Sequence, residues 1–366
     1  MRVLFMTNMP SPYRVDFFNE LGKYCELTVM FERDRDHSRD TRYKAGRFEN
    51  FKAVFLKGIS VSDAEAFCPA VVKLLSRKGF DCIIVGNYYS PTGMLAIEYM
   101  RLKRIPFVLS TDGGMVKENL GFKYKLKRHF IGSASGWLST GKMTTDYLVH
   151  YGADREKIMI YPFTSLRKSD ILTVPLTKKE KMALRQKLGI KEKKIVISVG
   201  QFIYRKGYDV LLNACADLNE EIGVYIIGGT PTEDYLKMKA DLHLDRVHFV
   251  DFMSKQDLAE YYKAADLFVL PTREDIWGLV INEAMAYGLP VVTTDRCVAG
   301  VELVENGITG QIVPAEDVNQ LRAAIIENVD YLDSVPQACL YKIGSYTIEE
   351  MAKRHVQYLK EKMLWK

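Results

Sequence analysis

The feature that most constrains the fold of this chain is a regular alternation of short apolar runs with longer amphipathic stretches. Most runs are apolar on both faces, which is typical of parallel strands that helices cover on both sides of a sheet. The chain is therefore predicted to be an α/β protein with two successive Rossmann-like domains. The first series of runs is Val3–Met6, Leu27–Phe31, Cys82–Val85, Phe107–Ser110, Gly136–Ser139 and Ile158–Tyr161; the second is Ile195–Val199, Val224–Ile227, Val247–Val250, Leu267–Leu270, Val291–Thr293 and Gly310–Val313.

The length of 366 residues agrees with two domains, because a single hydrophobic core rarely grows to this size. The two series are separated by the polar, proline-containing stretch "PFTSLRKSDILTVPLTKKEKMALRQKLGI". We place the boundary in this stretch, so that residues 1–168 form the N-terminal domain and residues 169–346 form the C-terminal domain.

Three features of the sequence favour the cytoplasm. No apolar run reaches the roughly 18 residues of a membrane-spanning helix. The N-terminal "MRVLFMTNMPSPYR" has too short an apolar run for a signal peptide, and we expect it to form a strand. The six cysteines form no C-x-x-C pair, which indicates reduced thiols. We expect a cytoplasmic protein that is dissolved or peripheral on the inner face of the cell membrane.

The charge of the chain is distributed unevenly. Residues 1–172 hold 27 Lys and Arg against 18 Asp and Glu, whereas the remainder holds 24 against 28. A basic first half suggests an anionic partner, such as nucleic acid, a phospholipid surface or a phosphorylated substrate, and ordinary scatter is the alternative. Because no nucleic-acid recognition motif is present, we expect no nucleic-acid partner.

The stretch "ISVGQFIYRKGYDVLL" predicts a strand, a glycine-containing turn and a helix. Gly200 lets the backbone approach a ligand, and the N-terminus of the following helix favours an anion. Arg205 and Lys206 add positive charge at the same place. The stretch therefore suits a diphosphate, although solvent-facing charges in a loop are the alternative.

The stretch "REDIWGLVINEAMAYGLPVV" places two carboxylates between apolar runs. Glu283 lies in the middle of a predicted helix with apolar neighbours on both sides, and Asp275 lies at or before the start of that helix. A carboxylate accepts hydrogen bonds from two neighbouring hydroxyls, which ribose and hexose rings both present. The alternatives are an N-cap for Asp275 and an exposed helical acid for Glu283.

These motifs resemble those of the retaining family-4 glycosyltransferases. "EDIWGLVINEAMAYGLPVV" is similar to their E-x7-E segment, and "VGQFIYRKGYDVLL" is similar to their phosphate loop. "MPSPYRVDFFNEL", "YGADREKIMIYPF", "GVELVENGITGQIV" and "YTIEEMAKRHVQYL" extend the resemblance over almost the whole chain. The resemblance implies a GT-B fold, with two Rossmann domains facing across a cleft and a C-terminal helix, 347–366, that crosses back to the first domain.

The resemblance also implies roles for single residues. Arg205 and Lys206 would neutralise the departing diphosphate, Glu283 would bind the ribose and Asp275 the transferred sugar. Two positions depart from the family pattern, because the first acid is Asp275 with Glu274 one residue early, and Gln201 replaces the loop arginine. Glu274 is therefore an alternative to Asp275.

Further donor contacts are implied for the backbone and for the nucleotide base. Trp277, Gly278 and Leu279 would present N–H groups to the sugar and the phosphates, and Val250 and Phe252 would lie beside the base. Two cations and a helix dipole stabilise a diphosphate without a metal ion. We therefore expect neither a metal nor another cofactor, and we interpret the D-x-D sequence at 34–36 as a solvated loop.

Two features of the first domain concern the acceptor. Asp112, in "LSTDGGM", follows a predicted strand where many relatives carry a histidine, and it is the candidate acceptor-side residue; a turn-forming Asp is the alternative. The segment 116–132 interleaves basic and aromatic residues, which suits an anionic membrane surface or a lipid-linked acceptor, and a solvated helix face is the alternative. Its basic side chains include Lys123, Lys125, Lys127 and Arg128.

The sequence thus predicts a retaining, metal-independent transferase. It would move a hexose from a nucleoside diphosphate sugar, such as a UDP-sugar, to a glycan or lipid-linked acceptor in surface polysaccharide biosynthesis. Front-face attack would let the departing diphosphate accept the proton of the acceptor. Two alternatives stay open: a non-catalytic nucleotide-sugar-binding subunit of a transferase complex, and a GT-B nucleotide-sugar epimerase.

Overall fold

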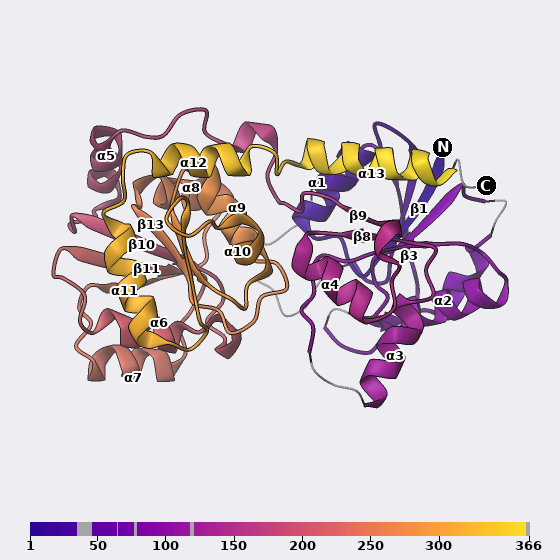
Figure 1. Cartoon of the computed structure of the whole chain (residues 1–366), viewed down its shortest axis with the longest axis horizontal. Helices are drawn as coiled ribbons and strands as arrows, with labels where there is room; N and C mark the ends of the chain where they lie inside the picture. Colours follow the sequence, from indigo (N-terminus) through magenta and orange to yellow (C-terminus); the bar gives the residue numbers. More distant parts are fainter. Residues whose placement is uncertain (35–45, 64, 77–78, 118–120, 364–366) are drawn as a thin grey trace. The chain divides into compact units, whose positions relative to one another are not determined.

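The structure is a computed structural model that describes residues 1–34, 46–63, 65–76, 79–117 and 121–363 (Figure 1). It divides into two units, of which the first comprises Met1–Ser165 with Thr347–Lys366 and the second comprises Leu166–Tyr346. The division after Ser165 falls three residues before the expected boundary at 168/169.

The first unit is built on a parallel seven-stranded sheet with the order β3-β2-β1-β6-β7-β8-β9. A short antiparallel pair, β4 (Ile59–Ser60) and β5 (Ala66–Phe67), lies outside this sheet. The sheet strands are β1 (Arg2–Thr7), β2 (Glu26–Phe31), β3 (Lys52–Phe55), β6 (Cys82–Val85), β7 (Val108–Ser110), β8 (Gly136–Ser139) and β9 (Ile158–Ile160).

Helices cover both faces of the first sheet. Side chains of α2, α3 and α4 join one core with inward side chains of the strands. On the other face, α1 packs against α13, and the ring of His355 lies 4.7 Å from that of Phe17 and 4.5 Å from that of Tyr161. The C-terminal helix thus belongs to the first unit, as the resemblance implied. The helices are α1 (Pro12–Leu21), α2 (Pro91–Leu102), α3 (Phe122–Ile131), α4 (Lys142–His150) and α13 (Ile348–Met363).

The second unit is built on a parallel six-stranded sheet with the order β12-β11-β10-β13-β14-β15. The chain runs outward from β10 on one side and then returns to begin the other side at β13. The crevice between β10 and β13 is the switch point at which open α/β sheets bind ligands. The strands are β10 (Lys194–Val199), β11 (Ile222–Ile227), β12 (Val247–Val250), β13 (Leu267–Leu270), β14 (Val291–Thr294) and β15 (Gly310–Val313).

Two helical layers enclose the second sheet. In Figure 1, α6, α7 and α11 cover one face, and α8, α9 and α12 cover the other. These two parallel-sheet units confirm the predicted Rossmann-like domains. The helices are α5 (Lys178–Leu188), α6 (Tyr208–Cys215), α7 (Glu233–Asp241), α8 (Lys255–Ala264), α9 (Leu279–Ala286), α10 (Val298–Leu303), α11 (Val318–Val329) and α12 (Val335–Ile343).

Candidate functional site

Two loops meet at the switch point of the second sheet. The loop after β10 ends at Gly207 and leads into α6, and the loop after β13 begins at Pro271 and leads into α9. Gly207 has a φ of +68°, and a Cβ atom on it would lie 2.1 Å from the carbonyl oxygen of Pro271. Glycine is therefore required here, both for the left-handed turn and for the close approach of the two loops.

Three predicted site residues converge between these loops. Lys206 Nζ lies 2.7 Å from Asp275 Oδ2, and Arg205 Nη1 lies 3.3 Å from the same oxygen. Arg205 also donates a 2.8 Å hydrogen bond to the carbonyl oxygen of Glu274. The side chains of Lys206 and Asp275 are 11% and 13% exposed, so Lys206 is not the solvent-facing charge of the alternative interpretation.

Arg273 binds the two loops together, and it was not among the residues predicted for the site. Its guanidinium donates to both carboxylate oxygens of Asp209, at 2.8 and 2.6 Å, and stacks 3.9 Å from the ring centroid of Tyr204. Its backbone N–H donates to the carbonyl of Arg205 at 2.9 Å. Hydrogen bonds from Arg273 lower the pKa of Asp209. The only local sign of this role in the sequence is that Arg273 directly precedes two acids. Its partner Asp209 follows a different strand, so the pairing becomes visible only once β10 and β13 are known to be neighbours.

The start of α9 lies directly after these charges. Gly278 precedes the helix with a φ of +101°, and Leu279 is its first residue. The side chain of Trp277 is buried, and its Nε1–H donates to Asn282 Oδ1 at 2.8 Å. Trp277 thus anchors the helix start in the core, while the first N–H groups of a helix lack intrahelical acceptors.

Glu283 lies in α9, where it is partly buried. The hydroxyl of Tyr262, on α8, donates to Glu283 Oε2 at 3.3 Å. Burial, and then the neighbouring Glu283 charge, raise the pKa of Tyr262 far above its ordinary value, so the phenol stays protonated as a donor. Glu283 is therefore not a freely exposed helical acid.

The remaining predicted donor contacts lie along the same edge of the sheet. Gly200 directly follows β10, where a Cβ atom would lie 3.1 Å from Lys206 Cε, so glycine leaves room for the lysine stem. Val250 ends β12, two strands away from β10, and Phe252 follows it; both are partly buried. The ring of Phe202 lies 5.2 Å from that of Phe249 and links the loop after β10 to β12.

Asp112 lies in the first unit, beyond the carboxyl end of β7. It pairs with the guanidinium of Arg14, and the Tyr13 hydroxyl donates to Asp112 Oδ2 at 3.3 Å. The Arg14 side chain is 6% exposed and that of Asp112 is 32% exposed. The carboxylate thus has a buried cation behind it and a solvent-facing side.

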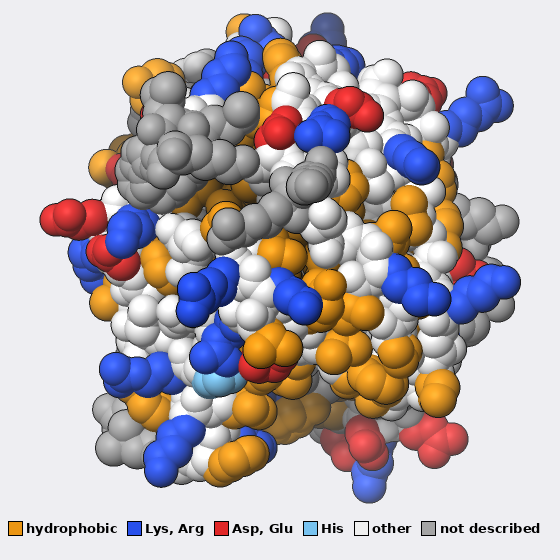
Figure 2. Space-filling model, turned by 90° about the vertical axis from the view of Figure 1, so that its right-hand side faces the viewer, with side chains coloured by type: hydrophobic (Ala, Val, Ile, Leu, Met, Phe, Trp, Pro, Cys, Tyr) orange, Lys and Arg blue, Asp and Glu red, His pale blue; other side chains and the backbone are white. Residues whose placement is uncertain are grey.

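Helix α3 (Phe122–Ile131) lies within the basic segment 116–132 of the first unit. Lys123, Lys125, Lys127 and Arg128 are all exposed, and the ammonium group of Lys127 also lies over the rings of Tyr147 and Tyr151. An open hollow of about 530 Å³ lies between α2 and α3. Figure 2 shows Lys and Arg side chains around a histidine, with an acidic side chain against the histidine and hydrophobic side chains nearby. Glu98 pairs with both Arg101 and His129 at this hollow. The hollow is lined by Arg101, Lys125, Arg128, His129, Gly132, Ser133 and Gly152.

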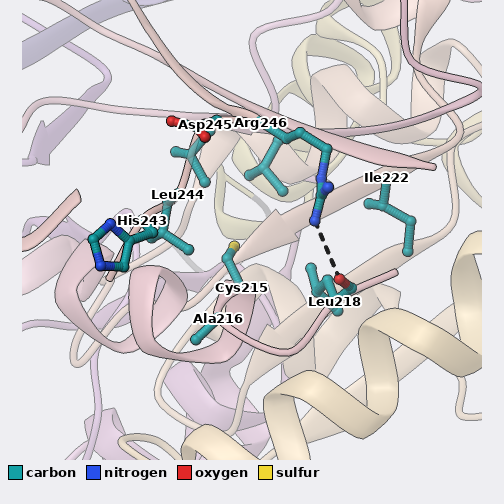
Figure 3. Close-up of a pocket in the computed structure, with 10 residues that line it drawn as sticks. Cys215, Ala216, Leu218, Ile222, His243, Leu244, Asp245 and Arg246 are labelled. Atoms are coloured by element: carbon teal, nitrogen blue, oxygen red, sulfur yellow. Dashed lines mark hydrogen bonds between the residues drawn. The ribbon is translucent and has the colours of Figure 1, made fainter. Parts of the chain in front are cut away.

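A separate cavity of about 80 Å³ lies at the opposite, amino edge of the second sheet (Figure 3). It lies where β11 begins at Ile222 and β12 begins at Val247, and Cys215 also lines it. Arg246 donates to the carbonyl of Leu218 at 3.4 Å across it. Because ligands of such sheets bind at the carboxyl edge, we assign this cavity no part in the site.

Two expectations concern metal ions and membrane spans. Among the described residues, no group of three or more His, Cys, Asp or Glu side chains is arranged to hold a metal ion. Of the D-x-D sequence, Asp34 is exposed, while Arg35 and Asp36 lie outside the described residues. Within the described ranges, no helix has the length and apolar character needed to cross a membrane.

Comparison with known proteins concerns first the unit that carries these loops. Residues 180–330 match the family described as glycosyl transferases group 1. The matched range contains Arg205, Lys206, Asp275 and Glu283, together with the switch point between β10 and β13.

Individual relatives extend the likeness. A D-inositol 3-phosphate glycosyltransferase of Xylanimonas cellulosilytica is 31% identical over 49% of this chain and 44% of its own length. The lipopolysaccharide glucosyltransferase WaaG of Escherichia coli is 29% identical over 50% of this chain and 53% of its own. The matches thus span about half the length of these curated relatives.

The likeness in fold covers the whole chain. The crystal structure of HepE (Alr3699) from Anabaena, in complex with UDP, superimposes with a TM-score of 0.76 over 99% of this chain and 100% of its own, at 18% identity. Together with the two parallel sheets, this confirms the GT-B fold.

Proposed function

We propose that this protein is a retaining, metal-independent glycosyltransferase that moves a hexose from a nucleoside diphosphate sugar to a glycan or lipid-linked acceptor. The observation that carries the proposal is the convergence of Arg205 and Lys206 on Asp275 at the switch point, within the range that matches the group 1 glycosyl transferases. The relative WaaG is a lipopolysaccharide glucosyltransferase, which supports a hexose donor and surface polysaccharide biosynthesis.

The proposed donor site follows from its charges. Two cations stabilise the negative charge that develops on a departing diphosphate, and N–H groups at the start of α9 add to them. Gly278 and Leu279 would then lie beside the phosphates, and the site would stabilise the diphosphate without a metal ion. Glu283, held by Tyr262, would accept hydrogen bonds from the ribose hydroxyls. The bound UDP in HepE supports UDP as the first nucleotide to test.

Retention of the anomeric configuration would follow from attack on the face that the diphosphate leaves. The acceptor oxygen then forms the new bond to the anomeric carbon while the bond to the diphosphate breaks. A diphosphate oxygen accepts the acceptor proton, so no general base is needed. Asp112 would orient an acceptor hydroxyl through its solvent-facing side.

The test is release of free nucleoside diphosphate from UDP-, GDP- and ADP-sugars in the presence of EDTA. We expect release from one donor in the wild type and none in Glu283→Ala, with the variant folded by circular dichroism. Release that requires an added divalent ion would contradict metal independence. Donor binding without release, even with a lipid extract as acceptor, would instead support the non-catalytic subunit.

We further propose that the hollow between α2 and α3 holds the protein on an anionic membrane surface, inside the cell. Lys125 and Arg128 line the hollow, and each of its two helices carries one exposed large apolar side chain at its end, Leu102 at the end of α2 (80% exposed) and Phe122 at the start of α3 (78% exposed). Cationic side chains flanked by exposed apolar ones suit the interface of an anionic bilayer.

Vesicle co-sedimentation tests this surface. Each Lys or Arg near an anionic surface contributes about 1 kcal/mol, so Lys125→Ala with Arg128→Ala should weaken binding to phosphatidylglycerol vesicles by at least about tenfold. The matched control, Lys179→Ala with Lys237→Ala, removes the same charge from the second unit. Equal losses in both double variants, or equal binding to neutral phosphatidylcholine vesicles, would contradict the assignment.

A further inference from the structure

The carboxylate of Asp275 lies where it competes with a phosphate. Both cations of the proposed diphosphate site, Lys206 and Arg205, approach the same oxygen of Asp275, at 2.7 and 3.3 Å. Because Lys206 and Asp275 are largely buried, water and salt screen their attraction weakly. A single carboxylate thus neutralises two cations that a diphosphate would need.

The surrounding bonds indicate which partner moves when the pair opens. The backbone of Asp275 is fixed on both sides, because its N–H donates to Arg296 O at 2.9 Å and its carbonyl accepts from Val298 N at 3.1 Å. Arg205 is anchored on the carbonyl of Glu274. The carboxylate therefore changes partner by rotation of its own side chain, while the loops stay in place.

The consequence differs for two ligands. A nucleoside diphosphate sugar that takes both cations also brings hydroxyls, and these donate to the displaced carboxylate. A free nucleoside diphosphate lacks the transferred sugar, so it brings no sugar hydroxyls to the displaced carboxylate. It leaves the Asp275 carboxylate in a largely buried place beside a phosphate of the same charge, which is unfavourable.

We propose that Asp275 is the residue by which the site discriminates the nucleoside diphosphate sugar from the free nucleoside diphosphate. The inference rests on the proposed function. Specificity of this kind comes from a repulsive element directed against the unwanted ligand. It weakens binding of the free diphosphate, so the same carboxylate that binds the sugar also favours release of the leaving product.

The test is a pair of dissociation constants, measured by titration calorimetry, for UDP and UDP-glucose and for GDP and GDP-mannose. We expect Asp275→Asn to bind the free diphosphate about tenfold more tightly than the wild type, and the sugar nucleotide no more tightly. Asp275→Ser should behave in the same way, and Asp275→Glu should restore the weak binding of the free diphosphate.

The matched control is Asp295→Asn. Asp295 follows β14 at the same edge of the sheet, and its side chain is 52% exposed. It pairs with Arg296 and accepts a hydrogen bond from the backbone N–H of Ala315. Unchanged affinity of the Asp275 variants for UDP and GDP would overturn the inference, as would an equal gain in Asp295→Asn. Failure of the wild type to bind either nucleotide pair would instead overturn the proposed function.

Discussion

Each unit places a cation–carboxylate pair beyond the carboxyl end of a strand, and the two pairs differ in which partner is buried. In the second unit, both Lys206 and Asp275 are largely buried, and Arg205 adds a second cation at the same oxygen. In the first unit, Arg14 is buried while Asp112 is one-third exposed. In the proposed function, the same kind of pair would offer cations to a ligand in the second unit and a carboxylate in the first.

The environment of Arg14 explains this difference. Its guanidinium carbon lies 5.7 Å from the ring centroids of Phe5 and Tyr13 and 5.8 Å from that of Phe163. Burial by itself lowers the pKa of Arg14, but the charge of Asp112, the neighbouring Tyr13 and Tyr161 and the hydrogen bond to Asp112 together outweigh it and raise the pKa above its ordinary value. Arg14 is therefore a permanent internal charge, and Asp112 compensates this charge while one side of its carboxylate stays open to solvent.

The largest effect is expected from a substitution that removes the ion pair between Arg14 and Asp112. Asp112→Asn should lower the free energy of unfolding by about 3–5 kcal/mol, because it leaves a buried Arg14 without its counter-charge. Calorimetric unfolding measures the loss, and Asp63→Asn, at an exposed acid of the same unit, is the control. Asp275→Asn also leaves a largely buried cation, Lys206, without its counter-charge. It should nevertheless cost less, because Lys206 is somewhat more exposed than Arg14 (11% against 6%) and Arg205 is 44% exposed. Equal losses for Asp112→Asn and Asp275→Asn would remove the distinction.

The second prediction uses His355 on α13, which the charge of Arg14 reaches. Burial, aided by Arg14, lowers the pKa of His355 from 6.5 to about 4, although its hydrogen bond to Met351 acts in the opposite direction. Between pH 6.5 and pH 4 the unfolded chain therefore binds a proton that the folded chain does not. Stability should fall by about 3 kcal/mol as the pH decreases through this window.

Unfolding free energies at pH 7 and pH 4.5 measure this loss. His355→Gln, which removes the titrating group, should show a smaller loss over the same interval. An identical pH dependence in the wild type and the variant would show that other groups account for acid sensitivity.

The third prediction sharpens the description of the second unit. Arg273→Lys keeps the charge but loses the two-pronged bond to Asp209, so the loops that carry Arg205 and Lys206 should be held less firmly. We expect affinity for the nucleoside diphosphate to decrease about tenfold. Arg296→Lys, at an exposed arginine, is the control, and equal affinities in both variants would argue against the coupling.

The smallest effect concerns a carboxylate with a neutral partner. Tyr262→Phe removes the hydrogen bond to Glu283 and should weaken binding of UDP about threefold. If Tyr262 acts through the ribose contact of Glu283, the loss should be smaller for 2′-deoxy-UDP. A threefold loss for both nucleotides would assign Tyr262 a packing role.

The fold was predictable because its strands are buried on both faces. β3 (Lys52–Phe55) was missed because it lacks this burial: it lies at the edge of the first sheet, and none of its residues is fully buried. The positions of Arg205, Lys206 and Asp275 were predictable from motif spacing, but the bonds among them depend on which strands are neighbours. The partnership of Arg14 with Asp112 joins residues 98 positions apart and left no local pattern.

The return of α13 to the first unit has a consequence for the order of assembly. During synthesis from the N-terminus, the second unit is complete once residue 346 has emerged, whereas the first still lacks the helix that covers Phe17 and Tyr161. The unit that is begun first is therefore finished last. Until α13 docks, the aromatic side chains beside α1 are exposed on the nascent chain. Exposed apolar surface of this kind is prone to aggregation, and chaperones protect it.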